Sequence, residues 1–398
     1  MVGRHFLARA LLVLTSLWLL GYVGAQASAA PTLRVGVIVS KSGSDARVGQ
    51  AQELAVEAFS TQLRAQRPSG AIGLEFATAD DGSLPNRAAR EARRLIANEE
   101  VHALICCTAT AATRLVSEVA EQQGVPLLAL SNADEVGRDN PYWVFSIPPD
   151  SRKAIQAMVL HIAWQGGQSV ALMALDNDYG EVAAQALDML LEPGGLRLVA
   201  EERYPPNVEV LTPEALWVAT RQPAGVIVWG LARDTVVAVD ALRRRGFDGD
   251  VYINPAVATA LSPLERMALE DVQVTTAPAR FADRLPASAP TYSETRRFAT
   301  QLRRAGNLMP PHQAAYAWDA ALLLTASLEQ ALILGLDLSE SRVFRQVVRD
   351  SIISLGSTTG AAASYNYREG DHVGVEARSL VVARLTRTGL SPEFGVGP

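Results

Sequence analysis

Short apolar runs alternate with longer stretches of helical periodicity along most of the chain. In the segment 103–133, the run 103–106 is too short for a helix and suits a buried parallel strand. Leu115, Val116 and Val119 then recur at helical spacing until Gly124, and a second apolar run covers 126–130. This segment is therefore predicted to be one right-handed βαβ unit.

The same rhythm continues on both sides of this unit. Alternating strands and helices are typical of doubly wound parallel sheets, and the second half repeats the first at similar size. The strands expected in the first half are 33–39, 72–77, 103–106, 126–130 and 142–147. Those expected in the second half are 169–175, 196–204, 225–229, 251–253 and 272–275. The helices 293–304, 312–335 and 341–351 and closing antiparallel strands near 364–367 and 379–385 are expected to follow.

Small polar residues follow two neighbouring predicted strands. Thr108 and Thr110 come after the run 103–106, and Ser131 and Asn132 come after the run 126–130. The carboxyl ends of parallel strands meet at one edge of a sheet, where ligands bind and helix N-termini offer N–H groups to an anion. Capping or turn chemistry explains either turn alone. Their convergence on one edge favours a binding site.

Residues 1–29 are predicted to be a signal peptide. Arg4 and Arg9 precede the apolar run 10–23, and small residues follow it as far as Ala30. The run is shorter than the roughly 20 residues that a membrane helix needs, although an uncleaved anchor is the alternative. No cysteine lies near the expected cleavage site, so a lipid-anchored form is not expected. The mature chain is expected to be exported and soluble.

Composition limits the function classes. The chain has 398 residues, 48% of them hydrophobic, and a net charge of −6, which suits two domains with proper cores. The acidic balance argues against nucleic acid as a partner, because no basic cluster forms a surface that tracks phosphates. The sequence has no Gly-x-Ser-x-Gly, HExxH or P-loop motif, so catalysis is not favoured and no metal or cofactor is expected.

The two cysteines are neighbours, Cys106 and Cys107. A disulfide between adjacent residues closes a strained ring, and disulfides prefer Cα atoms about 4.4–6.8 Å apart. Two buried thiols are therefore expected. A catalytic thiol would need a paired histidine, and none of the five histidines shows a recognisable pattern with the cysteines.

Several short motifs in this order resemble the type I periplasmic solute-binding proteins, such as the leucine/isoleucine/valine-binding proteins of ABC importers. The resemblance runs from about Leu33 to Leu385. No single motif is specific, but their order and spacing together are. The motifs are 35–37, Asp80-Asp81-Gly82, 105–110, Gly124-Val125-Pro126-Leu127, Asp178-Tyr179-Gly180, Leu242–Gly246 and Tyr316-Ala317-Trp318-Asp319-Ala320.

The resemblance implies the fold known as periplasmic binding protein-like I. This α/β fold has two doubly wound, Rossmann-like lobes joined by three hinge crossovers, with the ligand closed between them. It implies an N-terminal lobe of residues 31–147 plus 277–356 and a C-terminal lobe of residues 148–276 plus 357–398. The crossings would lie near Pro148, Ala277 and Gly356.

The resemblance also implies a binding site. In relatives that bind amino acids, the turns at Cys107-Thr108 and Ser131-Asn132 hold the ligand carboxylate, and a tyrosine matching Tyr179 closes over the ligand. Trp229 and Leu231 would form the opposite wall. The acidic residue that pairs with the ligand ammonium is replaced by Ala256, and a buried ammonium without a partner is costly. A carboxylate ligand without an amine, aromatic or otherwise apolar, is therefore favoured.

The resemblance implies a periplasmic, monomeric protein that delivers a small organic ligand to an ABC permease of the inner membrane. Two alternatives stay open. The same fold serves as a ligand-sensing module that signals to a partner, and an enzyme, such as a hydrolase, is the third reading. The ligand itself is not named by the sequence.

Overall fold

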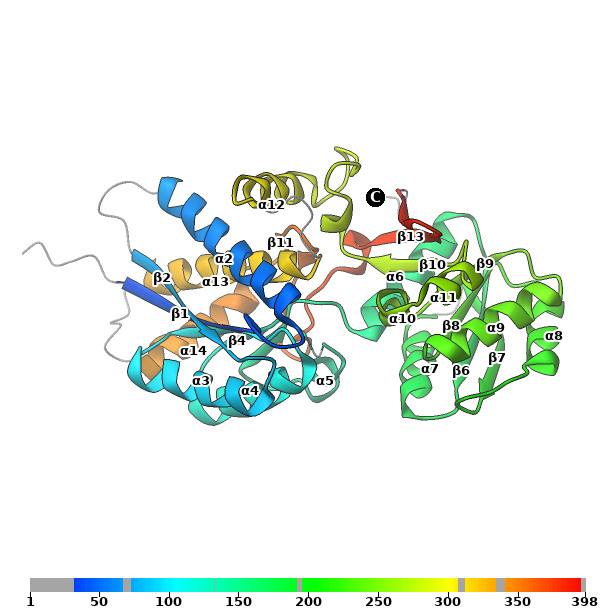
Figure 1. Ribbon diagram of the computed structural model, residues 1–398, viewed down its shortest axis with the longest axis horizontal. Coiled ribbons are helices and arrows are strands. Elements are labelled where there is room, and N and C mark those ends of the chain that lie inside the picture. Colours follow the sequence, from blue (N-terminus) through cyan, green and yellow to red (C-terminus); the bar gives the residue numbers. More distant parts are fainter. Residues whose placement is uncertain are drawn as a thin grey trace, which may run out of the picture.

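The computed structural model describes residues 32–66, 73–131, 133–191, 195–306, 312–333 and 341–394, which form two α/β lobes side by side (Figure 1). Each lobe is built on its own sheet, as the sequence predicts. The predicted signal peptide, residues 1–29, lies outside the described residues. No helix in the described part of the chain is long and apolar enough to cross a membrane.

The sheet of the first lobe has five parallel strands in the order β2-β1-β3-β4-β5. The strands are β1 (Thr32–Val39), β2 (Gly73–Asp80), β3 (Ala103–Cys106), β4 (Leu127–Ala129) and β5 (Val144–Ser146). Apolar side chains of β1 and β3 alternate between two core clusters, one on each face of the sheet. Such strands, buried on both faces, explain the continuous apolar runs in the sequence.

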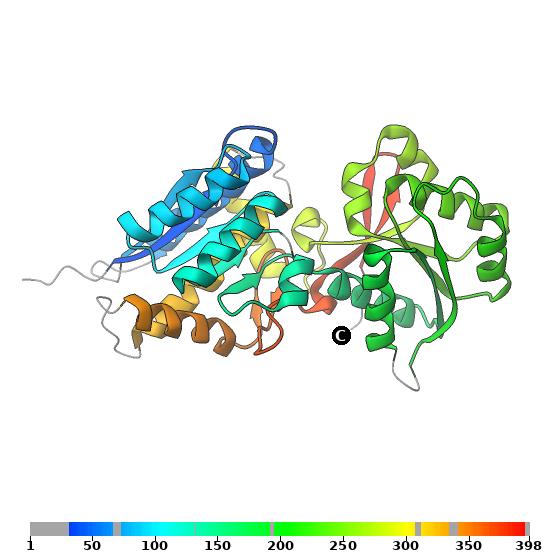
Figure 2. The same cartoon turned by 90° about the horizontal axis from the view of Figure 1, so that it is seen from below.

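Helices cover both faces of this sheet (Figures 1 and 2). On one face lie α2 (Ala46–Gln66), α13 (Gln313–Ile333), α14 (Ser341–Ser354) and α12 (Tyr292–Arg304). On the other face lie α3 (Pro85–Asn98), α4 (Thr110–Gln123) and the short α5 (Ala133–Asp139). Helix α4 ends at Gly124, which has φ of 62° and therefore the left-handed conformation that glycine adopts without strain.

The sheet of the second lobe has seven strands in the order β14-β13-β10-β9-β8-β6-β7. The strands β6 (Ser169–Leu175), β7 (Arg197–Tyr204), β8 (Gly225–Trp229), β9 (Asp250–Ile253) and β10 (Gln273–Thr276) are parallel. The closing strands β13 (Val381–Thr386) and β14 (Gly389–Glu393) are antiparallel. One face carries α6 (Ser151–Trp164) and α7 (Asp178–Leu190), and the other carries α8 (Thr212–Thr220), α9 (Ala232–Arg244), α10 (Pro255–Ala260) and α11 (Pro263–Ala268).

The chain crosses between the lobes three times. The first crossing leads from β5 to α6, and the second from β10 through the 3₁₀ helix η1 (Pro278–Phe281) to α12. The third lies at Leu380, between the 3₁₀ helix η2 (Ala377–Ser379) and β13. The sequence placed this third crossing near Gly356.

Residues 361–380 therefore differ from the predicted division of the lobes. They pack in the core of the first lobe, together with the two-stranded sheet of β11 (Thr358–Thr359) and β12 (Ser364–Tyr365). The physical reason is Asp319 of α13, whose carboxylate accepts hydrogen bonds from Ala361 N at 2.6 Å, Ala362 N at 2.8 Å and the Tyr365 hydroxyl at 2.8 Å. Of the predicted C-terminal part of the second lobe, only β13 and β14 join its sheet.

Candidate functional site

A cleft of 460 Å³ opens between the two lobes, at the carboxyl ends of both sets of parallel strands. The first lobe lines it with Thr108, Thr110, Leu130, Ser131, Ala133 and Asp134. The second lobe contributes Trp229, Asn254, Ala256, Ala258 and Thr259. The crossing segments and the start of α13 complete the wall with Pro148, Ala277, Arg280, His312, Gln313 and Tyr316.

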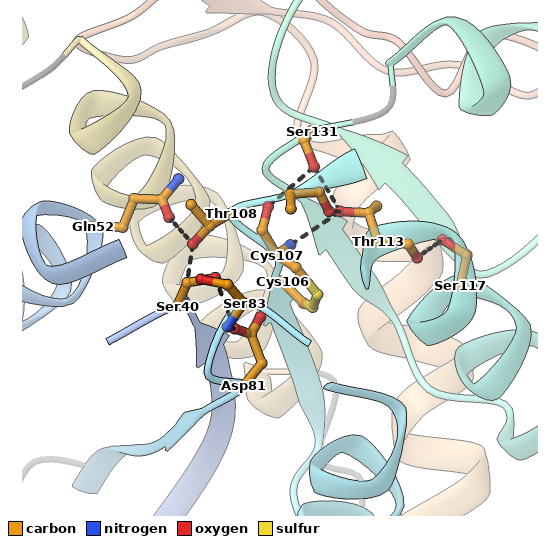
Figure 3. Close-up of a disulfide and its surroundings, with 11 residues drawn as sticks. Ser40, Gln52, Asp81, Ser83, Cys106, Cys107, Thr108, Thr113, Ser117 and Ser131 are labelled. Atoms are coloured by element: carbon orange, nitrogen blue, oxygen red, sulfur yellow. Dashed lines mark hydrogen bonds between the residues drawn. A yellow bond between two sulfur atoms is a disulfide. The ribbon is translucent and has the colours of Figure 1, made fainter. Parts of the chain in front are cut away.

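Hydroxyl groups tie together the turns that follow β3 and β4. The Ser131 hydroxyl donates to the Cys107 carbonyl at 3.1 Å and lies 2.7 Å from the Thr113 hydroxyl. Thr113 Oγ1 in turn accepts from Cys107 N at 3.3 Å (Figure 3). The two turns therefore form one rigid unit beneath the cleft, and its polar groups are oriented before any ligand arrives.

Thr108 is fixed from the other side. Its hydroxyl accepts from Ser40 N at 3.0 Å and donates to Gln52 Oε1 at 2.7 Å, which links β3 to the loop after β1 and to α2 (Figure 3). This hydroxyl does not cap a helix. Helix α4 begins after Ala109, whose side chain cannot cap it, and no side chain among the described residues accepts a hydrogen bond from its first turn. Its free N–H groups and the partial positive charge of the helix start favour an anion beside Thr110.

The expectation of two buried thiols is wrong in the structure, which joins Cys106 and Cys107 by a disulfide. The peptide bond between them is cis, and their Cα atoms lie 3.1 Å apart. Both residues are fully buried, in the core cluster behind the turn (Figure 3). Cys107 therefore does not line the cleft with its side chain, contrary to its predicted role. Its backbone N–H donates to the Thr113 hydroxyl and its carbonyl accepts from the Ser131 hydroxyl, so Cys107 contributes to the hydrogen bonds that join the two turns.

The wall of the second lobe is built around Asn254, which follows β9. Its side chain accepts from Ala256 N at 2.8 Å, capping α10, and its amide donates to the hydroxyl of Tyr179. Tyr179 packs on Trp229 with ring centroids 6.5 Å apart. Burial, together with the nearby charge of Asp134, raises the pKa of Tyr179 to about 12. The phenol is therefore neutral at pH 7.

Trp229 is 1% exposed, and its indole Nε1 has no hydrogen-bond partner in the described residues. A buried donor without an acceptor is uncommon and costly. Because Trp229 lines the cleft, an oxygen atom of a ligand is a candidate partner for this donor.

Two carboxylates line the cleft, Asp134 and Asp150. Both already accept hydrogen bonds from the chain: Asp134 from Ser151, and Asp150 from Lys153 N at 2.8 Å. Burial raises the pKa of the Asp150 carboxyl. The described residues contain no group of three or more acidic, histidine or cysteine side chains arranged to hold a metal ion.

The structure brings together most of the predicted site residues. Thr108, Ser131, Trp229 and Ala256 line the cleft, and Asn132 lies outside the described residues. Tyr179 stands one layer behind, because its hydroxyl is taken by Asn254. Leu231 does not line the cleft. It precedes the first residue of α9, and its side chain is 57% exposed.

Sequence reasoning missed other residues that line the cleft. Asn254 follows a predicted strand, so the rule that selected Thr108 and Ser131 would have selected it too. Asp134, Arg280 and His312 carry no such local signal, because they come from a short helix, a crossing segment and a helix start.

The sequence profile of the family described as "Periplasmic binding protein" matches residues 32–389. The chain belongs to this family. It is a type I periplasmic binding protein, similar to the leucine/isoleucine/valine-binding proteins, as the sequence motifs predict. The family is a class of solute-binding proteins rather than enzymes.

Individual relatives are distant. "Leu/Ile/Val-binding protein homolog 7" of Brucella abortus (strain 2308) is 25% identical over 252 residues, which are 60% of this chain and 63% of the relative. The match thus spans less than two thirds of the relative's length. An extracellular ligand-binding receptor from Rhodopseudomonas palustris HaA2 has a TM-score of 0.64 at 21% identity, over 91% of this chain and 99% of the other.

A leucine-binding protein from Thermotoga maritima MSB8 has a TM-score of 0.60 at 17% identity, over 92% of this chain and 99% of the other. These solved structures confirm the two-lobed fold.

Proposed function

We propose that this periplasmic binding protein captures a small organic acid in the cleft between its lobes and delivers it to an ABC permease of the inner membrane. The observation that carries the proposal is the composition of the cleft wall, in which turns from both sheets face one space of 460 Å³. A ligand that contacts both lobes stabilises the closed arrangement, and this biases a hinge equilibrium.

The wall of the first lobe suits a carboxylate. Helix α4 begins beside the cleft without a side-chain cap, and Thr110 and Ser131 line the cleft next to it. Among the described residues no lysine lines the cleft, and the Ser131 hydroxyl already donates to the Cys107 carbonyl, so the helix N–H groups and the Thr110 hydroxyl are the donors nearest to this position. Donors of this kind bind a carboxylate without needing a cation at the same place.

The wall of the second lobe does not suit the ammonium of an α-amino acid. Ala256 stands where the resemblance to amino-acid-binding relatives implies an acidic residue, and the side chain of the neighbouring Asn254 is neutral. The carboxylates that line the cleft among the described residues, Asp134 of α5 and Asp150 at the first crossing, lie outside the second-lobe wall, and each already accepts from Ser151 or from Lys153 N. An ammonium held against the wall at Ala256 would find no acidic side chain on that wall among the described residues, and a buried ammonium without such a partner is disfavoured.

A thermal-shift screen of the mature protein tests this proposal. Aliphatic acids, aromatic acids and free amino acids are compared at equal concentration, since a ligand that binds only the folded state raises the melting temperature. We expect an acid without an amine to give the largest shift. Stabilisation by leucine above that by every amine-free acid would contradict the proposed ligand class. Unchanged uptake of the bound acid in a deletion strain would contradict delivery to a permease.

A further inference from the structure

A second groove opens from the cleft beside the second crossing segment. Its volume is 520 Å³, and it shares Ala258, Thr259, Arg280, His312 and Gln313 with the cleft. Arg280 and His312 therefore stand at the junction of two cavities. A ligand held at the turns of Thr108 and Ser131 and long enough to cross the cleft would reach this junction.

The groove is strongly basic. Its lining includes five arginines from both lobes and from the crossing between them, Arg47, Arg266, Arg280, Arg284 and Arg303. Among the described residues a single carboxylate lines it, that of Asp283, which pairs with Arg303 and has Oδ1 3.5 Å from Arg296 Nη1. Walls that carry charge of one sign focus the field into a concave surface. The groove therefore attracts anions although the whole chain is acidic.

Four of these arginines have no carboxylate partner within the described part of the chain: Arg47 at the start of α2, Arg266 in α11, and Arg280 and Arg284 in the crossing. They come from the first lobe, the second lobe and the segment that joins them. Burial lowers the pKa of Arg280, and the nearby charge of Arg266 lowers it further. Like charges on facing lobes repel, so an anion placed among them would favour closure.

His312 adds a neutral donor to this basic set. Its Nδ1 lies 3.4 Å from Arg280 Nη1. A guanidinium can only donate, so Nδ1 accepts and the ring proton stays on Nε2. Burial and the charge of Arg280 lower the pKa of His312 to about 4, so the ring is neutral at pH 7. Helix α13 begins at the next residue and has no acidic side chain in its first turn, so its positive end adds to the field.

We propose that the ligand is a small organic acid with two anionic ends, one held at the turn of Thr108 and Ser131 and the other by Arg280 and His312. Arg47 and Arg266 complete the second position when the lobes close. This inference rests on the proposed function, since it assigns the far end of the same ligand. A ligand with two anionic ends has no ammonium group, so position 256 does not need an acidic side chain to pair with one.

Calorimetric titration of the wild-type protein gives the first test. Pairs of equal chain length are compared: hexanoate with adipate, and heptanoate with pimelate. In the better-fitting pair, the dicarboxylate should bind at least about tenfold more tightly, because a charge-assisted hydrogen bond to arginine is worth more than a neutral one. Its affinity should also fall more steeply with added salt. A third arm with 6-phosphonohexanoate separates a distal phosphonate from a distal carboxylate.

Variants give the second test. Arg280→Gln should cost the dicarboxylate about tenfold in affinity, and Arg280→Lys should recover part of the loss. Arg245→Gln removes the same charge outside the groove and should leave the dicarboxylate affinity within about twofold. If circular dichroism shows that Arg280→Gln does not fold, the comparison of monocarboxylates with dicarboxylates on the wild-type protein still tests the second anionic position.

The outcomes separate the two proposals. If neither monocarboxylates nor dicarboxylates bind, the proposed function itself fails. If a monocarboxylate binds as tightly as its dicarboxylate partner, or if Arg280→Gln leaves the dicarboxylate affinity unchanged, organic-acid capture stands and the second anionic position is overturned. Tighter binding of either doubly anionic probe, lost on Arg280→Gln, supports the proposal and identifies the distal group.

Discussion

Ser151 binds the carboxylate of Asp134 across the first crossing between the lobes. Its backbone N–H donates to Oδ1 at 2.7 Å, and its hydroxyl donates to Oδ2 at 3.0 Å. Asp134 lies in α5 of the first lobe, and Ser151 is the first residue of α6 in the second. The same carboxylate satisfies a free N–H group of α6 and lines the cleft, so the hinge and the site share a residue.

The first prediction concerns this bond. Asp134→Ala leaves the N–H group of Ser151 without its acceptor and removes a contact between the lobes. We expect the free energy of unfolding to fall by about 1–2 kcal/mol, as for the loss of a charge-assisted cap. Urea denaturation measures this. Asp139→Ala, an exposed residue of the same helix, is the control and should change stability by less than about 0.5 kcal/mol. Equal losses of stability in the two variants would show that the hydrogen bonds between Asp134 and Ser151 do not contribute to the free energy of unfolding.

The second prediction concerns Tyr179, which shapes the cleft without lining it. Tyr179→Phe removes the hydroxyl that receives the Asn254 amide but keeps the ring on Trp229. Asn254 loses one of its two anchors, so we expect the affinity for the organic acid to fall about fivefold to tenfold, equivalent to one neutral hydrogen bond. Calorimetry with the best acid of the screen measures this. Tyr142→Phe, an exposed tyrosine outside the cleft lining, is the control. An unchanged affinity in Tyr179→Phe would leave Tyr179 as a packing residue only.

The elements of both sheets could be predicted from the sequence because parallel strands buried on both faces leave continuous apolar runs. The runs 103–106 and 225–229 coincide with β3 and β8. The short helices α5, α10 and α11 were missed, because segments of six or seven residues contain less than two helical turns of periodicity.

The candidate site was predictable only where it follows strand ends. Thr108 and Ser131 are adjacent in space because β3 pairs with β4, and this pairing follows from the βαβ pattern. The placement of residues 361–380 depends on the buried carboxylate of Asp319, a contact between segments about forty residues apart in sequence. Arg280 and His312 are in contact for a similar reason. The second crossing segment passes the start of α13, and a contact between segments this far apart in sequence leaves no local sequence pattern that would predict it.

The third prediction separates two threonines of one turn. Thr108→Val removes a hydroxyl that bonds to Ser40 N and Gln52, whereas the Thr110 hydroxyl makes no hydrogen bond in the described residues. We expect Thr108→Val to lower the free energy of unfolding by about 1–3 kcal/mol, because two partly buried polar groups lose their partner. Thr110→Val should leave stability within about 0.5 kcal/mol of the wild type. Denaturant midpoints measure both. A smaller loss for Thr108→Val than for Thr110→Val would contradict the role of this network.

The last prediction follows from Asp319, the residue that holds the segment 361–380 against the first lobe. Burial raises the pKa of its carboxyl to about 7 from the ordinary 3.8, against the three hydrogen bonds that it accepts. A raised pKa in the folded state means that folding favours the protonated acid. The contribution of Asp319 to stability is therefore fully present below about pH 4 and is lost as the pH rises through about 7.

Asp319→Asn removes this titration while keeping the size of the side chain. We expect the variant to be less stable than the wild type at pH 5, because an amide cannot accept all three hydrogen bonds. The difference between them should shrink by roughly 1–3 kcal/mol between pH 5 and pH 8, where the wild type has lost its proton. Urea denaturation at several pH values measures this difference, and subtracting the two proteins cancels the titration of the histidines. Asp188→Asn, at an exposed position of α7, is the control and should change stability at pH 5 by less than about 0.5 kcal/mol. A gap between Asp319→Asn and the wild type that widens as the pH rises would show that the carboxylate, rather than the acid, is the form that holds the segment.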